Sequence, residues 1–111
     1  MPIDKLKDPM VDRLFQAIQT LQTMDEYYRF FDDLCTVNEV MAMAQRLAVA
    51  SMLRRGATYT QIEAETGAST ATISRVKRGL AYGASGIELA LQRLEEKERL
   101  SSRPEPQSRR T

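Results

Sequence analysis

The sequence has no histidine and no tryptophan, and it has a single cysteine, Cys35. A single cysteine cannot form an internal disulfide, and a chain without histidine lacks the commonest metal ligand and the commonest acid–base catalyst. Cys35 lies in an apolar stretch, where a free cysteine is usually a small packing residue and less often a reactive thiol. We therefore expect no disulfide, no metal site and no cofactor.

Long apolar runs are also missing. No segment approaches the about 20 consecutive apolar residues of a membrane-spanning helix, and the first residues lack the apolar centre of a signal peptide. We expect a cytoplasmic protein with no membrane partner. Of the 111 residues, 42% are hydrophobic, enough for one domain. In so short a chain, a second copy that covers leftover apolar surface would add stability.

No alternating run of strand length occurs, whereas apolar residues recur at helical spacing, which predicts an all-α fold of about six helices. A Ser or Thr followed three residues later by Glu is a typical helix start, because the two side chains can bond free backbone N–H groups reciprocally. Four such pairs occur: Thr23/Glu26, Thr36/Glu39, Thr60/Glu63 and Ser85/Glu88. Two more starts are expected at Asp8-Pro9 and at Ser69.

These starts divide the chain into three parts. Residues 1–8 are an N-terminal arm, and residues 9–100 are a helical domain. Residues 101–111 contain two prolines and no large apolar residue. This composition predicts a disordered tail.

Charge is distributed unevenly along the chain. The net charge is only +1. Residues 1–35 carry four basic and seven acidic residues, a net −3, whereas residues 54–78 carry five basic and two acidic residues, a net +3. The positive charge therefore belongs to one segment, which favours contact with an anionic partner.

That segment has the outline of a helix-turn-helix between Thr60 and Arg78, within residues 59–78. A short helix leads to Gly67, which fits a sharp turn because glycine takes a left-handed conformation freely. Ser69 then caps a second short helix. We expect the two helices to meet through a small apolar seam formed by Ile62, Ala68, Ile73 and Val76.

The second helix is the predicted recognition helix. Its short side chains would let it lie deep in a major groove, with hydroxyls on base edges and methyl groups on thymine methyls. The expected base contacts are Thr70, Ala71, Thr72 and Ser74. Basic and polar residues around them would contact phosphates: Thr60, Gln61, Arg55, Lys77 and Arg78. The alternative is a helical corner whose charges are merely solvated.

Glu63 departs from the common helix-turn-helix pattern, which has a small alanine at this place. Two interpretations are open. The side chain loosens the crossing of the two helices, or it points outward as the capping partner of Thr60.

The run Ala71-Thr72-Ile73-Ser74-Arg75, with the preceding Arg55-Gly56, resembles the tryptophan-repressor superfamily, and most of all its tryptophan-repressor-related branch. The resemblance extends over roughly residues 10–100. It implies an intertwined homodimer in which the first helices wrap around the partner's central helix. Independently, the first two predicted helices carry more aromatic surface than a monomer should expose: Phe15, Tyr27, Tyr28, Phe30 and Phe31. The alternative is that these rings pack within one chain.

The resemblance also implies an effector pocket formed by Thr36, Arg46 and Arg75. Where the tryptophan repressor has a glycine and a serine around the indole, this sequence has Val76 and Gly79, and a valine there should fill the space. We therefore do not expect tryptophan to bind, and a smaller effector stays an open question. The alternative is that Arg46 and Arg75 pair with carboxylates or phosphates and bind no small molecule.

Taken together, these patterns favour a sequence-specific regulator of transcription, of repressor type, that binds double-stranded DNA as a homodimer. The alternative is a dimeric helical protein-interaction module without DNA binding. An enzyme is not expected. No carboxylate lies in a motif with a nucleophile, a metal cluster or a phosphate-binding glycine loop.

Overall fold

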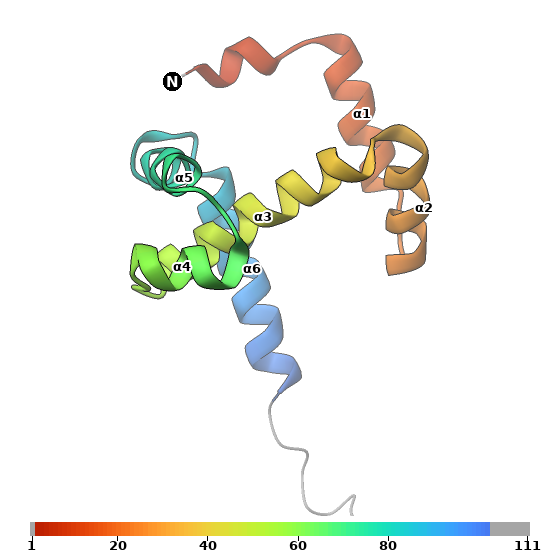
Figure 1. The fold of residues 1–111 in the computed structure, drawn as a ribbon. Coiled ribbons are helices and arrows are strands. Elements are labelled where there is room, and N and C mark those ends of the chain that lie inside the picture. The colour runs from red at the N-terminus through yellow and green to blue at the C-terminus, as the bar shows by residue number, and fades with distance from the viewer. Residues whose placement is uncertain (1, 103–111) are drawn as a thin grey trace, which may run out of the picture.

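The computed structural model describes residues 2–102 and is built from helices alone (Figure 1). A short 3-10 helix precedes six α-helices, which confirms the predicted all-α class. In chain order the elements are η1 (Pro2–Leu6), α1 (Pro9–Gln19), α2 (Met24–Leu34), α3 (Val37–Arg54), α4 (Tyr59–Thr66), α5 (Thr70–Tyr82) and α6 (Gly86–Ser101). The predicted tail, residues 101–111, lies outside the described residues from 103 onward, and Ser101 ends α6.

Four helices begin as the sequence predicts. Thr23 and Thr36 each form a complete capping box with the Glu three residues later, at the starts of α2 and α3. Asp8 caps α1 by accepting a hydrogen bond of 2.7 Å from the backbone N–H of Met10. Ser69 caps α5. In each case the capping oxygen satisfies an N–H group that has no partner inside its helix.

Two predicted capping pairs are wrong. Helix α4 is capped by Thr58 rather than Thr60: the Thr58 hydroxyl accepts from the Gln61 N–H at 3.2 Å, and the Gln61 side chain accepts from the Thr58 N–H at 2.8 Å. Ser85 has a φ of +69° and makes no capping hydrogen bond. Its expected partner, Glu88, instead binds Arg54 of α3.

The core lies where the last third of α3 meets α4, α5 and α6. Its buried apolar residues are Val49, Ala50, Met52, Ile62, Ala68, Ile73, Val76 and Leu91. The four residues predicted to join the two helices of the helix-turn-helix are all among them. This core therefore fixes α4 and α5 against the end of α3.

Helices α1 and α2 lie at the opposite end of α3, away from α4 and α5 (Figure 1). Within the described chain, none of their residues is buried. The radius of gyration is 17.2 Å, whereas a compact domain of 100 residues has about 13 Å. The chain by itself is thus an extended object with a core at one end.

Large apolar side chains are exposed on α1, α2 and the first two-thirds of α3, away from the core. The most exposed of them, between 41% and 80%, are Met10, Phe15, Met24, Tyr28, Leu34, Val37, Met41, Met43 and Leu47. We call these residues the α1–α3 surface. None of the described helices is long and apolar enough to cross a membrane.

Candidate nucleic-acid interface

The turn between α4 and α5 depends on a glycine and on two hydrogen bonds that involve Thr66. Gly67 has a φ of +74°. An added Cβ there would approach only the Gln45 amide, at 4.0 Å, so the backbone conformation and not crowding calls for glycine. That amide donates to the carbonyl oxygen of Thr66 at 3.0 Å, which ties the turn to α3. The Thr66 hydroxyl accepts from the N–H of Ala68 at 3.1 Å. The turn is therefore rigidly placed.

Helix α5 continues four residues beyond the predicted end at Arg78, to Tyr82. Ile73 and Val76 face the core, while Ala71, Arg75 and Arg78 are exposed. The spacing of four and three puts the exposed three on one side of the helix. We call them the outer face of α5. The whole helix carries three basic residues and no acidic one.

The predicted base contacts are not equivalent. Ala71 and Thr70 are exposed, whereas Thr72 and Ser74 are half-buried. The Thr72 hydroxyl accepts from the Ser69 hydroxyl at 3.1 Å. The Ser74 hydroxyl lies 3.4 Å from the hydroxyl of Tyr59 on α4. Two of the three predicted hydroxyls are therefore already paired within the helix-turn-helix.

The third hydroxyl is paired as well. Thr70 donates to the carboxylate of Glu63 at 2.6 Å. This contact answers the open question about Glu63, which is half-buried and directed at the first residue of α5. It is not the capping partner of Thr60. Sequence reasoning missed the pair because its two members belong to different helices.

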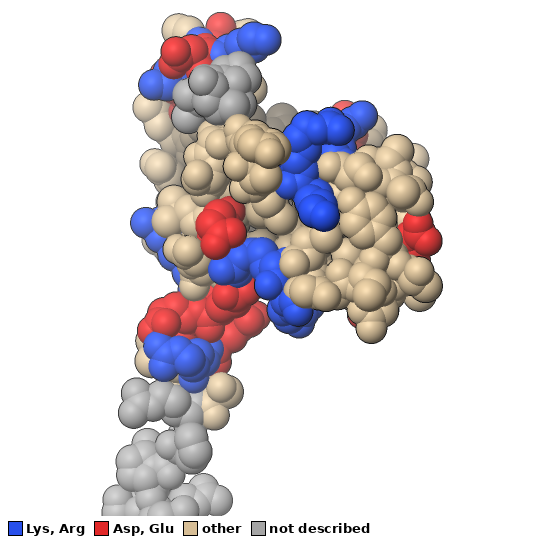
Figure 2. All heavy atoms as spheres, turned by 90° about the vertical axis from the view of Figure 1, so that its left-hand side faces the viewer, with Lys and Arg blue, Asp and Glu red and all other residues tan. Residues whose placement is uncertain are grey.

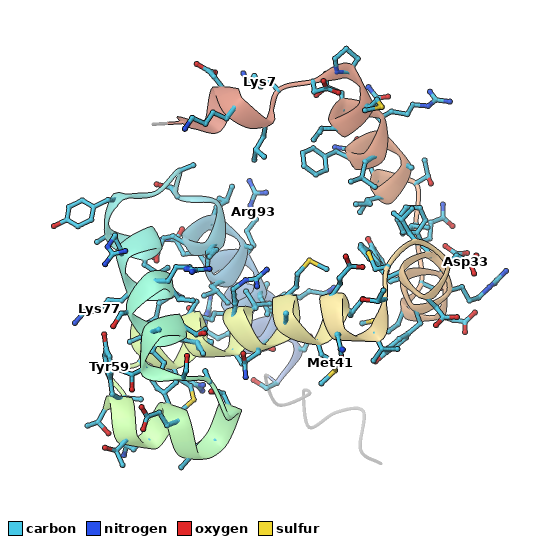
Figure 3. The ribbon with its side chains drawn as sticks, turned by 45° about the horizontal axis from the view of Figure 1, so that its top comes forward. Lys7, Asp33, Met41, Tyr59, Lys77 and Arg93 are labelled. Carbon is cyan, nitrogen blue, oxygen red and sulfur yellow. The ribbon has the colours of Figure 1, made fainter. Side chains whose placement is uncertain are left out.

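The five predicted phosphate contacts, Thr60, Gln61, Arg55, Lys77 and Arg78, are all exposed. Lys77 is also held in place, because its Nζ lies 5.8 Å from the centre of the Tyr59 ring. Figure 3 shows both side chains at the same edge of the helix-turn-helix. An ammonium group over a ring face at this distance is attracted by the ring quadrupole.

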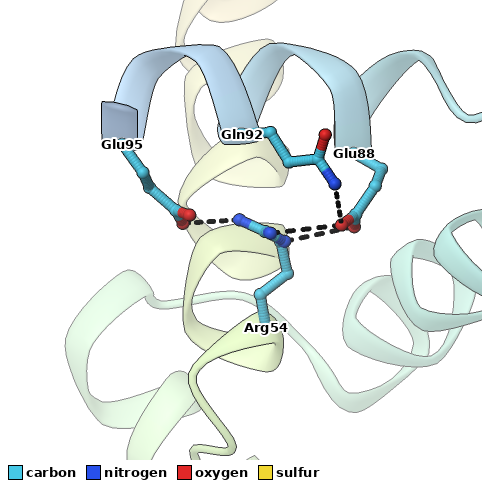
Figure 4. Close-up of polar contacts among 4 residues, drawn as sticks. All are labelled: Arg54, Glu88, Gln92 and Glu95. Atoms are coloured by element: carbon cyan, nitrogen blue, oxygen red, sulfur yellow. Dashed lines mark hydrogen bonds and ion pairs between the residues drawn. The ribbon is translucent and has the colours of Figure 1, made fainter. Parts of the chain in front are cut away.

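Arg54 does not belong to the interface, although the sequence count included its charge. Its Nε and Nη2 atoms each lie 3.1 Å from the carboxylate of Glu88, and Nη1 binds Glu95 (Figure 4). The bond to Glu95 raises the pKa of Arg54, burial lowers it, and Glu88 raises it again, so the net pKa is above its ordinary value. Arg54 therefore joins α3 to α6 through its ion pairs with Glu88 and Glu95.

The other basic residues make the surface around the helix-turn-helix positively charged. Figure 2 shows Lys and Arg side chains gathered on the side of the molecule that carries α4 and α5, while acidic side chains cluster lower, on the stem that leads to the C-terminus. Arg55, Arg75, Lys77 and Arg78 supply positive charge in and beside the helix-turn-helix. A surface of this kind attracts a polyanion.

Two residues of the predicted effector pocket, Thr36 and Arg46, lie well apart along α3 within one chain. The Thr36 hydroxyl caps α3 by accepting from the Glu39 N–H at 3.1 Å. Arg46 lies ten residues further along the same helix, about 15 Å along its axis. Arg75 is on the outer face of α5. One chain alone does not bring the three together, so a pocket made of all three would need a second chain.

Thr36 instead lines an apolar cavity of about 300 Å³ between α2 and α3, beside Tyr27, Phe31 and Met41. This cavity adjoins the α1–α3 surface. Within residues 2–102 no three His, Cys, Asp or Glu side chains are grouped so that they could hold a metal ion.

Comparison with known proteins gives a consistent result. The family model described as "Trp repressor protein" matches residues 10–95. The chain is 60% identical to the uncharacterized protein YerC of Bacillus subtilis over 92% of this chain and 98% of that protein. A crystal structure of a candidate Trp repressor from Staphylococcus aureus superposes with a TM-score of 0.81 at 54% identity, over 86% of this chain and 95% of that one. A TrpR-like protein from Eubacterium eligens has a TM-score of 0.80 at 52% identity, over 83% and 95% of the two chains.

Proposed function

The chain belongs to the Trp repressor protein family, and from this premise we propose that it is a sequence-specific regulator of transcription, of repressor type, that binds double-stranded DNA as a homodimer. The observation that carries the proposal is the outer face of α5. It combines one small residue with two arginines and has no acidic neighbour on its own helix. A helix of this composition fits the major groove, with its cations toward phosphates.

The turn supports this role. In a helix-turn-helix the N-terminal residues of the second helix reach base edges, while the first helix crosses the backbone. Here Thr70 and Ala71 stand at that end of α5, Thr60 and Gln61 lie on α4, and Lys77 is held over Tyr59. Thr72 and Ser74 are the next candidates for base contacts, as they lie within the first two turns of α5.

The α1–α3 surface supports the homodimer. Apolar side chains of this size and exposure are rarely left in water as one contiguous area on a monomer. A two-fold symmetric partner would cover them and place two copies of α5 on the same molecule. The expected operator is therefore two-fold symmetric, with half-sites about one helical turn apart.

A second chain would also be needed for an effector pocket made of Thr36, Arg46 and Arg75. Two guanidinium groups and a hydroxyl would suit a small carboxylate. As a regulator of bacterial chromosomal DNA, the protein would act in the cytoplasm. The alternative function, a dimeric interaction module without DNA binding, is compatible with the low net charge of +1.

A salt titration of binding to duplex DNA distinguishes the two functions. For a DNA-binding protein the logarithm of the affinity falls linearly with the logarithm of salt concentration, by about 0.9 per phosphate neutralised. Lys77→Ala or Arg78→Ala should therefore weaken binding to all duplexes alike and reduce the slope by about 0.9 for each chain.

The matched control is Arg29→Ala. Arg29 lies on α2 and pairs with Asp25 at 3.4 Å, at the other end of α3, so its loss should leave the slope unchanged. A wild-type chain that binds no duplex at low salt would contradict the proposed function and favour the interaction module.

A further inference from the structure

The contact between Glu63 and Thr70 has a consequence for base selection. The Thr70 hydroxyl and the Glu63 carboxylate are 2.6 Å apart, a separation typical of a hydroxyl that donates to an ionised carboxylate. Thr70 is the first residue of α5, the end of a recognition helix that reaches base edges. The contact therefore holds a carboxylate at the groove end of the helix, on a face that is otherwise basic or neutral.

The pair can only accept hydrogen bonds from a base. An ionised carboxylate has no donor, and Thr70 has one O–H, which it gives to Glu63. What remains toward the groove are the lone pairs of the carboxylate and of the hydroxyl. Guanine presents the acceptors N7 and O6 in the major groove, and thymine presents the acceptor O4. The pair would repel both of these base edges.

Cytosine fits this arrangement better than adenine. In the major groove the N4 amino group of cytosine has one neighbouring acceptor, O6 of the paired guanine, whereas the N6 amino group of adenine lies between two acceptors, its own N7 and O4 of the paired thymine. The one N–H of the cytosine amino group that is not used in base pairing can be shared by two adjacent acceptors on the protein, because the C5–H side of cytosine carries no acceptor. On adenine one of them would face N7.

We propose that Glu63, positioned by Thr70, is a specificity-determining residue that selects a cytosine in each half-site of the operator. The assignment rests on the proposed function, since it requires α5 to lie in a major groove. It replaces the sequence-based expectation that the Thr70 hydroxyl reads a base by itself. The negative charge of Glu63 lowers the affinity for every duplex. Its contribution is therefore to discriminate between sequences and not to strengthen binding.

Selection from a random duplex pool tests the assignment with four chains: wild type, Glu63→Gln, Thr70→Val and Glu65→Gln. The glutamine of the Glu63→Gln variant has the same shape as the glutamate but also carries a donor, and glutamine pairs well with adenine N6 and N7. We expect one position per half-site at which the wild type prefers cytosine, and a preference about tenfold weaker there in Glu63→Gln, with adenine gaining. Thr70→Val should weaken the same position, because the carboxylate loses its partner.

Glu65→Gln is the control for charge. Glu65 is exposed on the same helix, so its neutralisation should raise affinity for all duplexes and leave the base profile unchanged. Thermal unfolding of each variant confirms that it is folded.

The outcomes separate the two claims. A pool in which the wild type enriches no sequence would overturn the proposed function, and the role of Glu63 with it. An enriched site whose profile is the same for Glu63→Gln, or changed equally by Glu65→Gln, would overturn the role of Glu63 alone.

Discussion

At the scale of single residues, the helix-turn-helix separates side chains that join helices from those that meet solvent. Ile62 and Ile73 are completely buried, and Val76 is 5% exposed. Farther along α5, Gly79 is exposed, and an added Cβ there would meet nothing within 4 Å. The buried apolar residues hold α5 against the core, whereas Gly79 leaves the surface of the helix open.

Val76 and Gly79 bear on the effector. We expect free tryptophan not to bind and not to strengthen operator binding, because Val76 should fill the space that an indole needs and Gly79 has no hydroxyl for the ligand's amino group. Isothermal titration calorimetry of the protein with tryptophan measures this directly, with tryptophan injected into buffer as the control for heats of dilution. Saturable binding at micromolar concentration would show that the pocket is open despite Val76.

At the scale of elements, sequence reasoning succeeds where the determining contacts are local. The capping boxes at Thr23 and Thr36 and the turn at Gly67 each depend on residues within four positions, so a pattern identifies them. It fails where another partner competes. Thr58 and Thr60 lie two residues apart and each precedes a Glu or Gln by three, so the pattern alone does not decide which one caps α4.

Distance along the chain explains the other failures. The pattern pairs Glu88 with Ser85, three residues away, but Glu88 binds Arg54, which is 34 residues away. Similarly, the partners of Ser74 and Thr70 are Tyr59 and Glu63 on the preceding helix. A hydroxyl or carboxylate at the surface has many equivalent partners in sequence, and only the packing of α3 to α6 selects one. Four of the buried residues, Ile62, Ala68, Ile73 and Val76, were predictable because the helix-turn-helix outline places them between its two helices.

The turn yields a prediction at this scale. Gly67→Ala should lower the free energy of unfolding by about 1–2 kcal/mol, because a Cβ in the left-handed conformation is strained. Gly79→Ala is the matched substitution. It lies inside a helix with open space around it and should raise the free energy of unfolding by up to about 1 kcal/mol. Urea denaturation of both variants measures the two effects, and effects of the same sign would contradict this account of the turn.

At the scale of the whole molecule, the core and the α1–α3 surface occupy opposite ends of one helix. The last third of α3 supplies Val49, Ala50 and Met52 to the core. Its first part carries Val37 and Met41, which are 71% and 62% exposed. A monomer would leave this end of α3 without a covering layer.

We expect wild-type protein at micromolar concentration to sediment as two chains of 12.6 kDa each. Tyr28→Asp should shift it toward one chain, because a carboxylate would then be placed in the covered apolar surface. Tyr82→Asp is the control: Tyr82 is 79% exposed, close to the 73% of Tyr28, but lies at the end of α5. A wild type that sediments as a stable monomer, or equal shifts in both variants, would refute the dimer built on the α1–α3 surface.

The continuity of α3 has a consequence for operator geometry. Its 18 residues form one uninterrupted helix, about 27 Å long, and α5 is packed on its far end. In a dimer joined through the first part of α3, the length of this helix fixes the distance between the two copies of α5. One base pair added between the half-sites would rotate one of them by about 35° around the DNA axis. A continuous α3 helix cannot bend to follow that rotation. We therefore expect a change in half-site spacing to weaken operator binding as strongly as a change in the half-site sequence.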